Sequence, residues 1–326
     1  MIIDNFNRIH NYLRISLTNN CNFQCLYCNP EEKISKISNK KMMTKEEIFE
    51  ISSFFVKLGV KKIRLTGGEP FLRKDFKEII SSLKKLNVEI GITTNGFFID
   101  KYVDFLIENN IKIINLSLDT LDEKKFFSIT KRNFLKKILK NIRILAKKNF
   151  YFKINVVIMK GINENEIFDF IKWAENLPIK LRFIEYMPFK GNKWTWNDVF
   201  SYEDILNKIS EKYNFKKIED KKNDTSKNFF ISKNKVKFAV ISSISNSFCE
   251  TCNRIRISSD GQLQNCLFSR QTFDLLGSYR NKKNIIPIIL KAFNEKHKER
   301  GGMTEFINFE KNLQTETGRK MTNIGG

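Results

Sequence analysis

The chain has 326 residues, of which 41% are hydrophobic and 13% aromatic, so it can bury a substantial core. No stretch approaches the roughly 20 consecutive apolar residues that a membrane span needs, and the N-terminus lacks the apolar region of a signal peptide. We therefore expect a globular, cytoplasmic protein that does not associate with a membrane.

The charge is strongly unbalanced. The chain has 58 Lys and Arg against 36 Asp and Glu, which gives a formal net charge of +22. A basic field of this size attracts polyanions such as nucleic acids and nucleotide triphosphates. The lysines are scattered along the chain, however, so we favour compositional bias over a nucleic-acid footprint and expect no nucleic-acid partner.

The first two thirds of the chain alternates strand-like and helix-like segments. The pattern predicts strands at Tyr12–Thr18, Lys61–Thr66, Val88–Thr94, Lys112–Leu118, Tyr151–Ile158 and Lys180–Tyr186. It predicts helices between them, for example at Thr44–Leu58, Asp75–Leu86, Phe134–Lys148 and Asn163–Asn176. Thr44 and Glu47 have the spacing of a capping box. Six strand–helix units in series favour a parallel α/β sheet.

Polar or glycine-bearing segments follow five of these strands. They are Thr66–Pro70, Thr93–Gly96, Ser117–Asp119, Lys160–Gly161 and Glu185–Pro188. Functional sites of parallel sheets and α/β barrels lie at the carboxyl ends of the strands. We therefore predict one shared cleft, and this regularity favours a barrel over an open sheet.

The alternation of strand-like and helix-like segments ends after Tyr213. The charged stretch Lys216–Asn228 is typical of a linker or long loop. Short strands are predicted at Phe229–Ser232 and Lys235–Ile241, and a helix at Ile285–Lys298. We expect an α/β barrel domain over residues 1–215 and a smaller α+β domain over residues 216–326.

Six cysteines form two groups. Cys21, Cys25 and Cys28 are spaced C-x3-C-x2-C, whereas Cys249, Cys252 and Cys266 are spaced C-x2-C-x13-C. Clustered cysteines in a large cytosolic chain more often bind metal than form disulfides. Four thiolates saturate a [4Fe–4S] cluster, so three leave one iron open to a small molecule. A zinc site, which normally has four ligands, and buried structural cysteines are the alternatives.

The second cysteine group contains two arginines. Arg254 and Arg256 share one face if Arg254-Ile255-Arg256 is a strand. The planar guanidinium forms charge-assisted, bidentate hydrogen bonds that suit a triphosphate. Next to a cluster with an open iron we interpret the pair as an anion site, although exposed arginines are usually solvated surface.

The first cysteine group carries a recognisable signature. Together with Tyr27 before its last cysteine and Gly67-Gly68-Glu69-Pro70 after the second strand, it resembles the radical S-adenosylmethionine (SAM) superfamily. The resemblance implies a partial (β/α)6 TIM-like barrel. It also implies that the backbone and carboxylate of the Gly-Gly-Glu-Pro segment hold the SAM amino group. Further SAM contacts implied in the same way are Tyr27, Ser117 and Met187.

A narrower resemblance extends from about Arg14 to the last residue. It is carried by the segments RLTGGEPFLRKD, TTNGF, NLSLDTLD, KINVVIMKGIN, LRFIEYMP and FCETCNRIRISSDGQLQNCLF. These resemble the GTP 3′,8-cyclase family (molybdenum cofactor biosynthesis protein A). The resemblance implies two [4Fe–4S] clusters, one on each cysteine group, with SAM on the first. The residues implied as GTP contacts are Arg14, Arg64, Thr93, Lys153, Arg182, Arg254, Ile255 and Arg256.

The implied reaction converts GTP to (8S)-3′,8-cyclo-7,8-dihydroguanosine 5′-triphosphate, the first step of molybdenum cofactor biosynthesis. The family also implies a homodimer, a tail ending in Gly325-Gly326 that inserts toward the active site, and cyclic pyranopterin monophosphate synthase as the next enzyme.

Two other functions are open. One is a different twin-cluster radical SAM enzyme that modifies a peptide or RNA, although peptide modifiers typically have more C-terminal cysteines. The other is a non-catalytic iron–sulfur protein that binds nucleic acid, in which the Gly-Gly-Glu-Pro segment would have no role.

Overall fold

A computed structural model describes residues 1–28, 41–303 and 321–324. Six parallel strands follow one another in the sheet in chain order. They are β1 (Tyr12–Ser16), β2 (Lys62–Thr66), β3 (Glu89–Thr94), β4 (Ile113–Ser117), β5 (Phe152–Ile158) and β6 (Ile179–Glu185). The six predicted strands are thereby confirmed.

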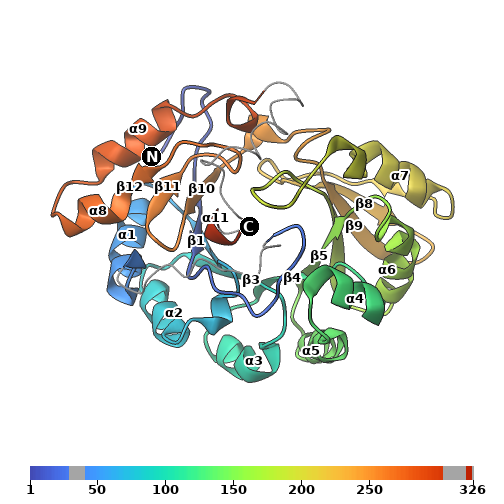
Figure 1. Cartoon of the computed structure of the whole chain (residues 1–326). Coiled ribbons are helices and arrows are strands. Elements are labelled where there is room, and N and C mark those ends of the chain that lie inside the picture. Colours follow the sequence, from blue (N-terminus) through green and yellow to red (C-terminus); the bar gives the residue numbers. More distant parts are fainter. Residues whose placement is uncertain (29–40, 304–320, 325–326) are drawn as a thin grey trace.

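The sheet is curved, and helices cover its outer face (Figure 1). They are α1 (Lys45–Lys57), α2 (Phe76–Lys84), α3 (Ile99–Glu108), α4 (Glu123–Thr130), α5 (Leu135–Lys147) and α6 (Ile167–Ala174). The predicted capping box of α1 is present, because Glu47 N donates to Thr44 Oγ1 and Thr44 N to Glu47 Oε2. Side chains alternate across each strand, so Leu13 and Leu65 are buried under the helices while Arg14 and Arg64 face the opposite side.

The C-terminal third extends the same sheet at both edges. On one side lie β9 (Val236–Ile241), β8 (Lys227–Ile231) and β7 (Lys216–Lys217), with β9 parallel to β6. On the other side lie β10 (Arg254–Ile257), β11 (Gln262–Gln264) and β12 (Phe273–Asp274), with β10 parallel to β1. The full order is β12-β11-β10-β1-β2-β3-β4-β5-β6-β9-β8-β7. Because one sheet runs through the whole chain, the boundary after residue 215 stays a prediction.

The C-terminal third also contains the helices α7 (Tyr202–Ser210), α8 (Leu275–Arg280) and α9 (Ile286–Asn294). Two predictions need correction. The stretch Lys216–Asn228 is not all linker, since β7 and the start of β8 lie in it and pair with each other. The helix predicted over Ile285–Lys298 ends at Asn294, and its last four residues continue as loop.

The short helix α11 (Met321–Ile324) contacts β1 and lies within the barrel opening (Figure 1). Thr322 and Ile324 are buried, at 4% and 2% exposure. The predicted Gly325-Gly326 tail lies outside the described residues. In the described part of the chain, no helix is long and apolar enough to cross a membrane.

Candidate functional site

The loop after β1, which carries the first cysteine group, is tied to the turn after β2. Gly68 N donates to Thr18 O at 2.7 Å, and Glu69 N donates to Asn20 O at 2.8 Å. A β-carbon at Gly68 would lie 2.2 Å from Asn20 O. Glycine therefore lets the turn approach the backbone immediately before Cys21.

Glu69 is completely buried, and its carboxylate is directed into the chain. It accepts hydrogen bonds from Thr94 Oγ1 at 2.8 Å, Asn95 N at 2.8 Å and Phe71 N at 3.2 Å. Burial outweighs these bonds and raises the pKa of Glu69 to about 7. The side chain thus orders two strand-end loops, and its direct contact with the SAM amino group stays a prediction.

The three thiols of the first group are half-buried, in surroundings that disfavour a negative charge. Burial, with a further contribution from Glu69, raises the pKa of Cys21 to about 12. Burial and the neighbouring thiols also raise the pKa values of Cys25 and Cys28. Thiolates here need a positive partner, which a [4Fe–4S] cluster supplies. The donor set therefore fits a cluster.

Among the described residues, no three His, Cys, Asp or Glu side chains converge closely enough to hold a single metal ion. A cluster does not require such convergence, because each cysteine binds a different iron. All six cysteines are free thiols and are partly exposed.

Tyr27, expected to contact SAM, is fixed by Asp119. Its hydroxyl donates to Asp119 Oδ2 at 2.7 Å, and Asp119 Oδ1 accepts from Val157 N at 2.9 Å. Burial raises the pKa of Asp119 to about 6. Asp119 was noted in the sequence only as part of a strand-end segment, and its role as the partner of Tyr27 was missed.

An apolar cluster surrounds this end of the barrel and is separate from the main core. Tyr27 belongs to it, and the partly buried residues packed against it include Cys25, Cys28, Met187, Phe268 and Met303. Met187 thus packs near the first cysteine group, and its contact with SAM stays a prediction. Ser117 is half-buried at the carboxyl end of β4, paired with Asn155 of β5.

The second cysteine group lines one cavity, together with Arg254 and Arg256. Burial alone would raise the pKa of Cys252, but Arg254 and Lys296 lower it to about 6. Burial raises the pKa of Cys249. Cys252 is therefore the thiol most readily held as a thiolate, and this donor set also fits a cluster.

Buried cations line the inner face of the barrel. Arg256, Arg14 and Arg64 lie in one lateral row, because β10, β1 and β2 are in register at these positions. Lys153 of β5 and Arg182 of β6 continue this lining. The predicted GTP contacts with charged side chains thus come together in the structure.

The positive charges of these side chains repel one another. Burial and then Arg182 lower the pKa of Lys153 to about 8, while burial and then Arg64 lower that of Arg182 to about 9. No carboxylate in the described ranges forms an ion pair with Arg64, Lys153, Arg182 or Arg254. Such a wall is suited to a polyanion, which would relieve the repulsion.

Polar atoms without partners lie beside the cations. Thr93 Oγ1, Asn115 Oδ1 and Asn155 Oδ1 are buried and have no hydrogen-bond partner among the described residues. They belong to β3, β4 and β5, where Thr93 is paired with Asn115. Because buried polar groups are rarely left unpaired, this wall has the character of a binding surface.

Ile255, also predicted as a GTP contact, directs its side chain away from the cavity. Its side chain is completely buried in the main core, on the opposite face of β10 from Arg254 and Arg256. Strand alternation therefore leaves only its backbone for a ligand.

Two further residues shape the cationic wall and were missed from the sequence. Arg64 Nε donates to the Tyr12 hydroxyl, and a β-carbon at Gly91 would lie 2.9 Å from Arg64 Nη2. Tyr12 could have been found, because it lies two residues before Arg14 on the same strand face.

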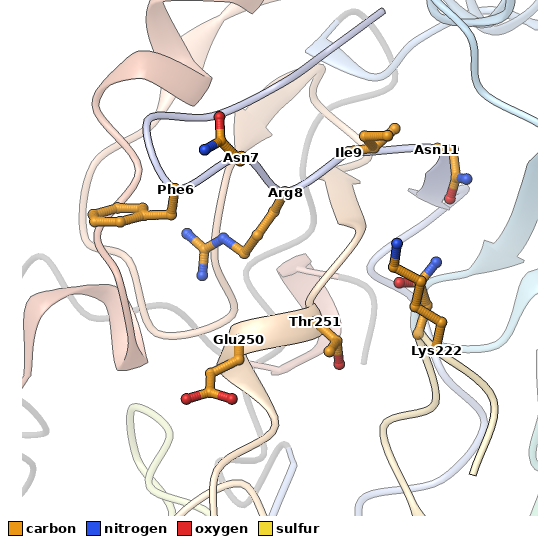
Figure 2. A pocket seen from close by; sticks show the side chains of 9 residues that line it. Phe6, Asn7, Arg8, Ile9, Asn11, Lys222, Glu250 and Thr251 are labelled. Carbon is orange, nitrogen blue, oxygen red and sulfur yellow. The ribbon is translucent and has the colours of Figure 1, made fainter.

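Figure 2 shows a separate pocket where the N-terminal segment meets the turn that follows Cys249. Phe6, Arg8, Lys222, Glu250 and Thr251 are among its lining residues, which include no described cysteine. The guanidinium of Arg8 is already bonded to the carbonyl of Cys249 at 2.8 Å. We attribute this pocket to the packing of the segment.

Comparisons with known proteins agree with this geometry. The family described as the radical SAM superfamily matches residues 15–174, and the family described as Molybdenum Cofactor Synthesis C matches residues 179–301. A protein named GTP 3′,8-cyclase from Listeria monocytogenes is 34% identical over 332 residues, which is 100% of this chain and 99% of that protein. The chain belongs to the GTP 3′,8-cyclase family.

Other members of the GTP 3′,8-cyclase family are longer. The mitochondrial GTP 3′,8-cyclase of Arabidopsis thaliana is 37% identical over 100% of this chain and 84% of its own length. The protein named molybdenum cofactor biosynthesis protein 1 from Dictyostelium discoideum is 41% identical over 94% of this chain. The chain spans about half of that relative's length, 50%.

The fold agrees as well. The crystal structure of Streptococcus suis SuiB superposes with a TM-score of 0.63 at 17% identity, covering 98% of this chain and 74% of that one. This similarity confirms the predicted barrel architecture. The superfamily to which the chain belongs uses a [4Fe–4S] cluster with SAM.

Proposed function

We propose that this protein converts GTP to (8S)-3′,8-cyclo-7,8-dihydroguanosine 5′-triphosphate, the first step of molybdenum cofactor biosynthesis. The observation that carries the proposal is the wall of buried cations inside a barrel that also bears two three-cysteine groups. Either feature alone has other uses. Together they suit a radical enzyme whose substrate is a small polyanion.

Each cysteine group would hold one [4Fe–4S] cluster, the first through Cys21, Cys25 and Cys28 and the second through Cys249, Cys252 and Cys266. When bound, the first cluster with SAM would supply the radical chemistry that joins the ribose 3′ carbon of GTP to guanine C8. The chain's own residues bind and orient the reactants.

The triphosphate would lie against Arg14, Arg64 and Arg182, whose guanidinium groups form charge-assisted hydrogen bonds with phosphate oxygens. Lys153 adds a fourth cation. Thr93 Oγ1 and Asn115 Oδ1 have no hydrogen-bond partner within the described part of the chain and suit the ribose hydroxyls. Such positioning can lower the activation free energy by about 7–11 kcal/mol in favourable cases, because it replaces a bimolecular encounter by a fixed geometry.

The SAM side of the cavity would be shaped by the Gly67–Pro70 turn, Ser117, Met187 and Tyr27. Asp119 fixes the ring of Tyr27 through its hydroxyl. The surrounding apolar cluster excludes water from the place where a radical forms, which limits side reactions.

The test is anaerobic. The reconstituted protein is mixed with SAM, dithionite and GTP, and the products are identified by mass spectrometry. We expect 5′-deoxyadenosine together with an isomer of GTP. The variant Arg64→Gln should lose GTP conversion, whereas Arg143→Gln, at an exposed position on α5, should match the parent.

Formation of 5′-deoxyadenosine without change in GTP would refute the substrate, while an iron-loaded protein that leaves SAM intact would refute the reaction class. A homodimer and cyclic pyranopterin monophosphate synthase as the next enzyme stay predictions carried by the family resemblance. The cytoplasmic location stays a prediction from the sequence.

A further inference from the structure

Lys296 is a buried cation without a carboxylate partner. It is 4% exposed, and no Asp or Glu of the described chain lies within ion-pair distance of its ammonium. Its ammonium donates a hydrogen bond to a cysteine, since Nζ lies 3.9 Å from Cys252 Sγ. Arg254 Nη2 lies 3.7 Å from the same sulfur. One ligand of the second group therefore faces two cations.

This arrangement is costly unless the sulfur carries negative charge. A buried ammonium is stabilised only by a nearby anion or by several hydrogen bonds. The anion that fits is the thiolate of Cys252, because its sulfur lies 3.9 Å from the Lys296 ammonium. Lys296 is thus placed to act on the second cysteine group.

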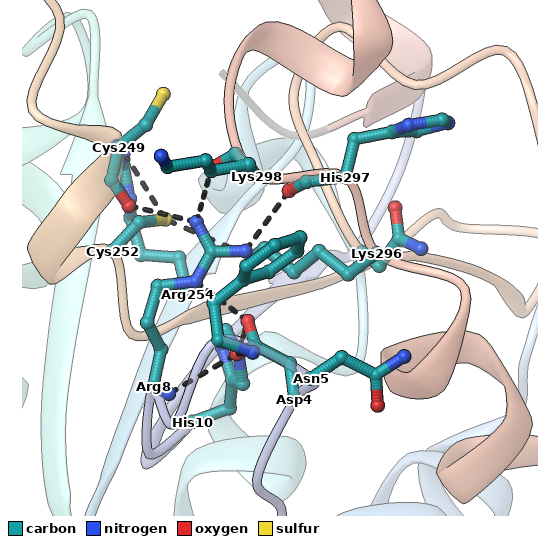
Figure 3. A network of polar contacts seen from close by, with 12 residues as sticks. Asp4, Asn5, Arg8, His10, Cys249, Cys252, Arg254, Lys296, His297 and Lys298 are labelled. Carbon is teal, nitrogen blue, oxygen red and sulfur yellow. Dashed lines mark hydrogen bonds and ion pairs between the residues drawn. The ribbon is translucent and has the colours of Figure 1, made fainter.

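The position of Lys296 is fixed by a group that we call the N-terminal clamp, formed by Asp4, Arg8 and His10 (Figure 3). Asp4 Oδ2 accepts from Arg8 Nε at 2.6 Å and lies 2.9 Å from His10 Nε2. Burial and Lys296 lower the pKa of His10 to about 3, so its imidazole is neutral and donates to Asp4.

The clamp reaches both sides of the second cysteine group. Arg8 Nη1 donates to Cys249 O at 2.8 Å and to Lys298 O at 2.6 Å, and Nη2 donates to His297 O at 2.9 Å. One guanidinium therefore joins the backbone of a ligand to the two residues that follow Lys296. The backbone next to Lys296 is therefore tied to the backbone of Cys249, which keeps the lysine close to the second cysteine group.

We propose that Lys296 is a positioning residue for the second iron–sulfur cluster, whose ammonium donates to the Cys252 sulfur, retains that ligand and raises the reduction potential of the cluster. Hydrogen bonds to the sulfurs and local charge are among the factors that set the potential of such clusters. A cation beside Cys252 stabilises the reduced, more negative state. The inference rests on the proposed function, which places a cluster on this group.

The test compares Lys296→Met, which keeps much of the length and removes the charge, with Lys296→Arg, which keeps the charge. Lys291→Met is the matched control, because Lys291 lies on α9 with its side chain 67% exposed. The midpoint potential is measured by redox titration with EPR detection, in the full holoenzyme and in a chain whose first three cysteines are alanine. Iron per chain and the melting temperature are measured alongside.

We expect the potential of the second cluster to shift to a more negative value in Lys296→Met, to recover most of the way in Lys296→Arg, and to be unchanged in Lys291→Met. An unchanged potential at equal iron content in Lys296→Met overturns the inference. If the variant loses the cluster, recovery in Lys296→Arg supports the assignment, whereas loss in both with a lowered melting temperature overturns it.

The proposed function fails in a different way. A parent protein with two clusters should bind about eight iron atoms per chain. A parent that binds about four, all lost with the first three cysteines, would refute the second cluster and the role of Lys296 with it.

Discussion

The substitution Gly68→Ala should disable the first cysteine loop without unfolding the barrel. The new β-carbon would lie 2.2 Å from Asn20 O, whereas ordinary contact begins at 3.4 Å, so the two groups must separate by 3.4 − 2.2 = 1.2 Å. The neighbour is a backbone carbonyl and not a flexible side chain. It is also the acceptor of Glu69 N, so separation breaks that bond.

Overpacking of this kind costs about 1–3 kcal/mol, and the lost hydrogen bond adds about 1 kcal/mol. We expect the barrel to stay folded despite these two losses of stability. The functional cost is larger, because Cys21 follows Asn20 directly and a displacement of about 1 Å can lower a rate about 100-fold. We therefore expect a folded protein with reduced iron content and a loss of about 100-fold in SAM cleavage.

The assay measures iron per chain after anaerobic reconstitution, the rate of 5′-deoxyadenosine formation and the melting temperature. Gly161→Ala is the control. Gly161 has a φ of 76° and nothing within 4 Å of a β-carbon, so this change costs about 1 kcal/mol of backbone strain without a clash. Wild-type iron content and rate in Gly68→Ala would refute the reasoning.

Two further predictions concern buried charges. Burial would raise the pKa of Tyr12, but Arg64 and Arg14 lower it to about 7. The ionised phenol therefore stabilises the fold fully above pH 10, and this contribution is lost as the pH falls through about 7. The excess in unfolding free energy of wild type over Tyr12→Phe should therefore be larger at about pH 9 than at about pH 6 in denaturant titrations, and a pH-independent difference would contradict this. Asp4→Asn leaves the buried guanidinium of Arg8 without its counter-charge and should cost about 3 kcal/mol. It should also lower the iron content of the second cysteine group. Wild-type stability in Asp4→Asn would show that the N-terminal clamp does not stabilise the fold.

The sequence predicted the parts of the fold that depend on local pattern. Alternating β-branched segments located all six strands of the barrel, and the hydroxyl and carboxylate of Thr44 and Glu47 located the start of α1. The charged stretch after residue 215 hid β7 and the first two residues of β8, because β7 has only two residues and both are exposed lysines.

The sequence also predicted part of the candidate site. Motif spacing identified the cysteines, and strand alternation explains why Arg254 and Arg256 line the cavity while Ile255 does not. Lys296 and Arg8 could not be found, because single cations carry no local signal in a chain with 58 Lys and Arg. Their roles arise from contacts between the two ends of the chain.

The pairing of β10 with β1 has a consequence for synthesis of the chain. Tyr12 is paired with Arg254, 242 residues later, and the Asn253 side chain reaches Asn11 across the same separation. Contacts this distant form slowly, because a long loop must close first. While the ribosome is still making the C-terminal third, β1 presents an unpaired edge that favours aggregation. Premature termination before β10 should therefore yield insoluble fragments, because β1 would keep an unpaired edge.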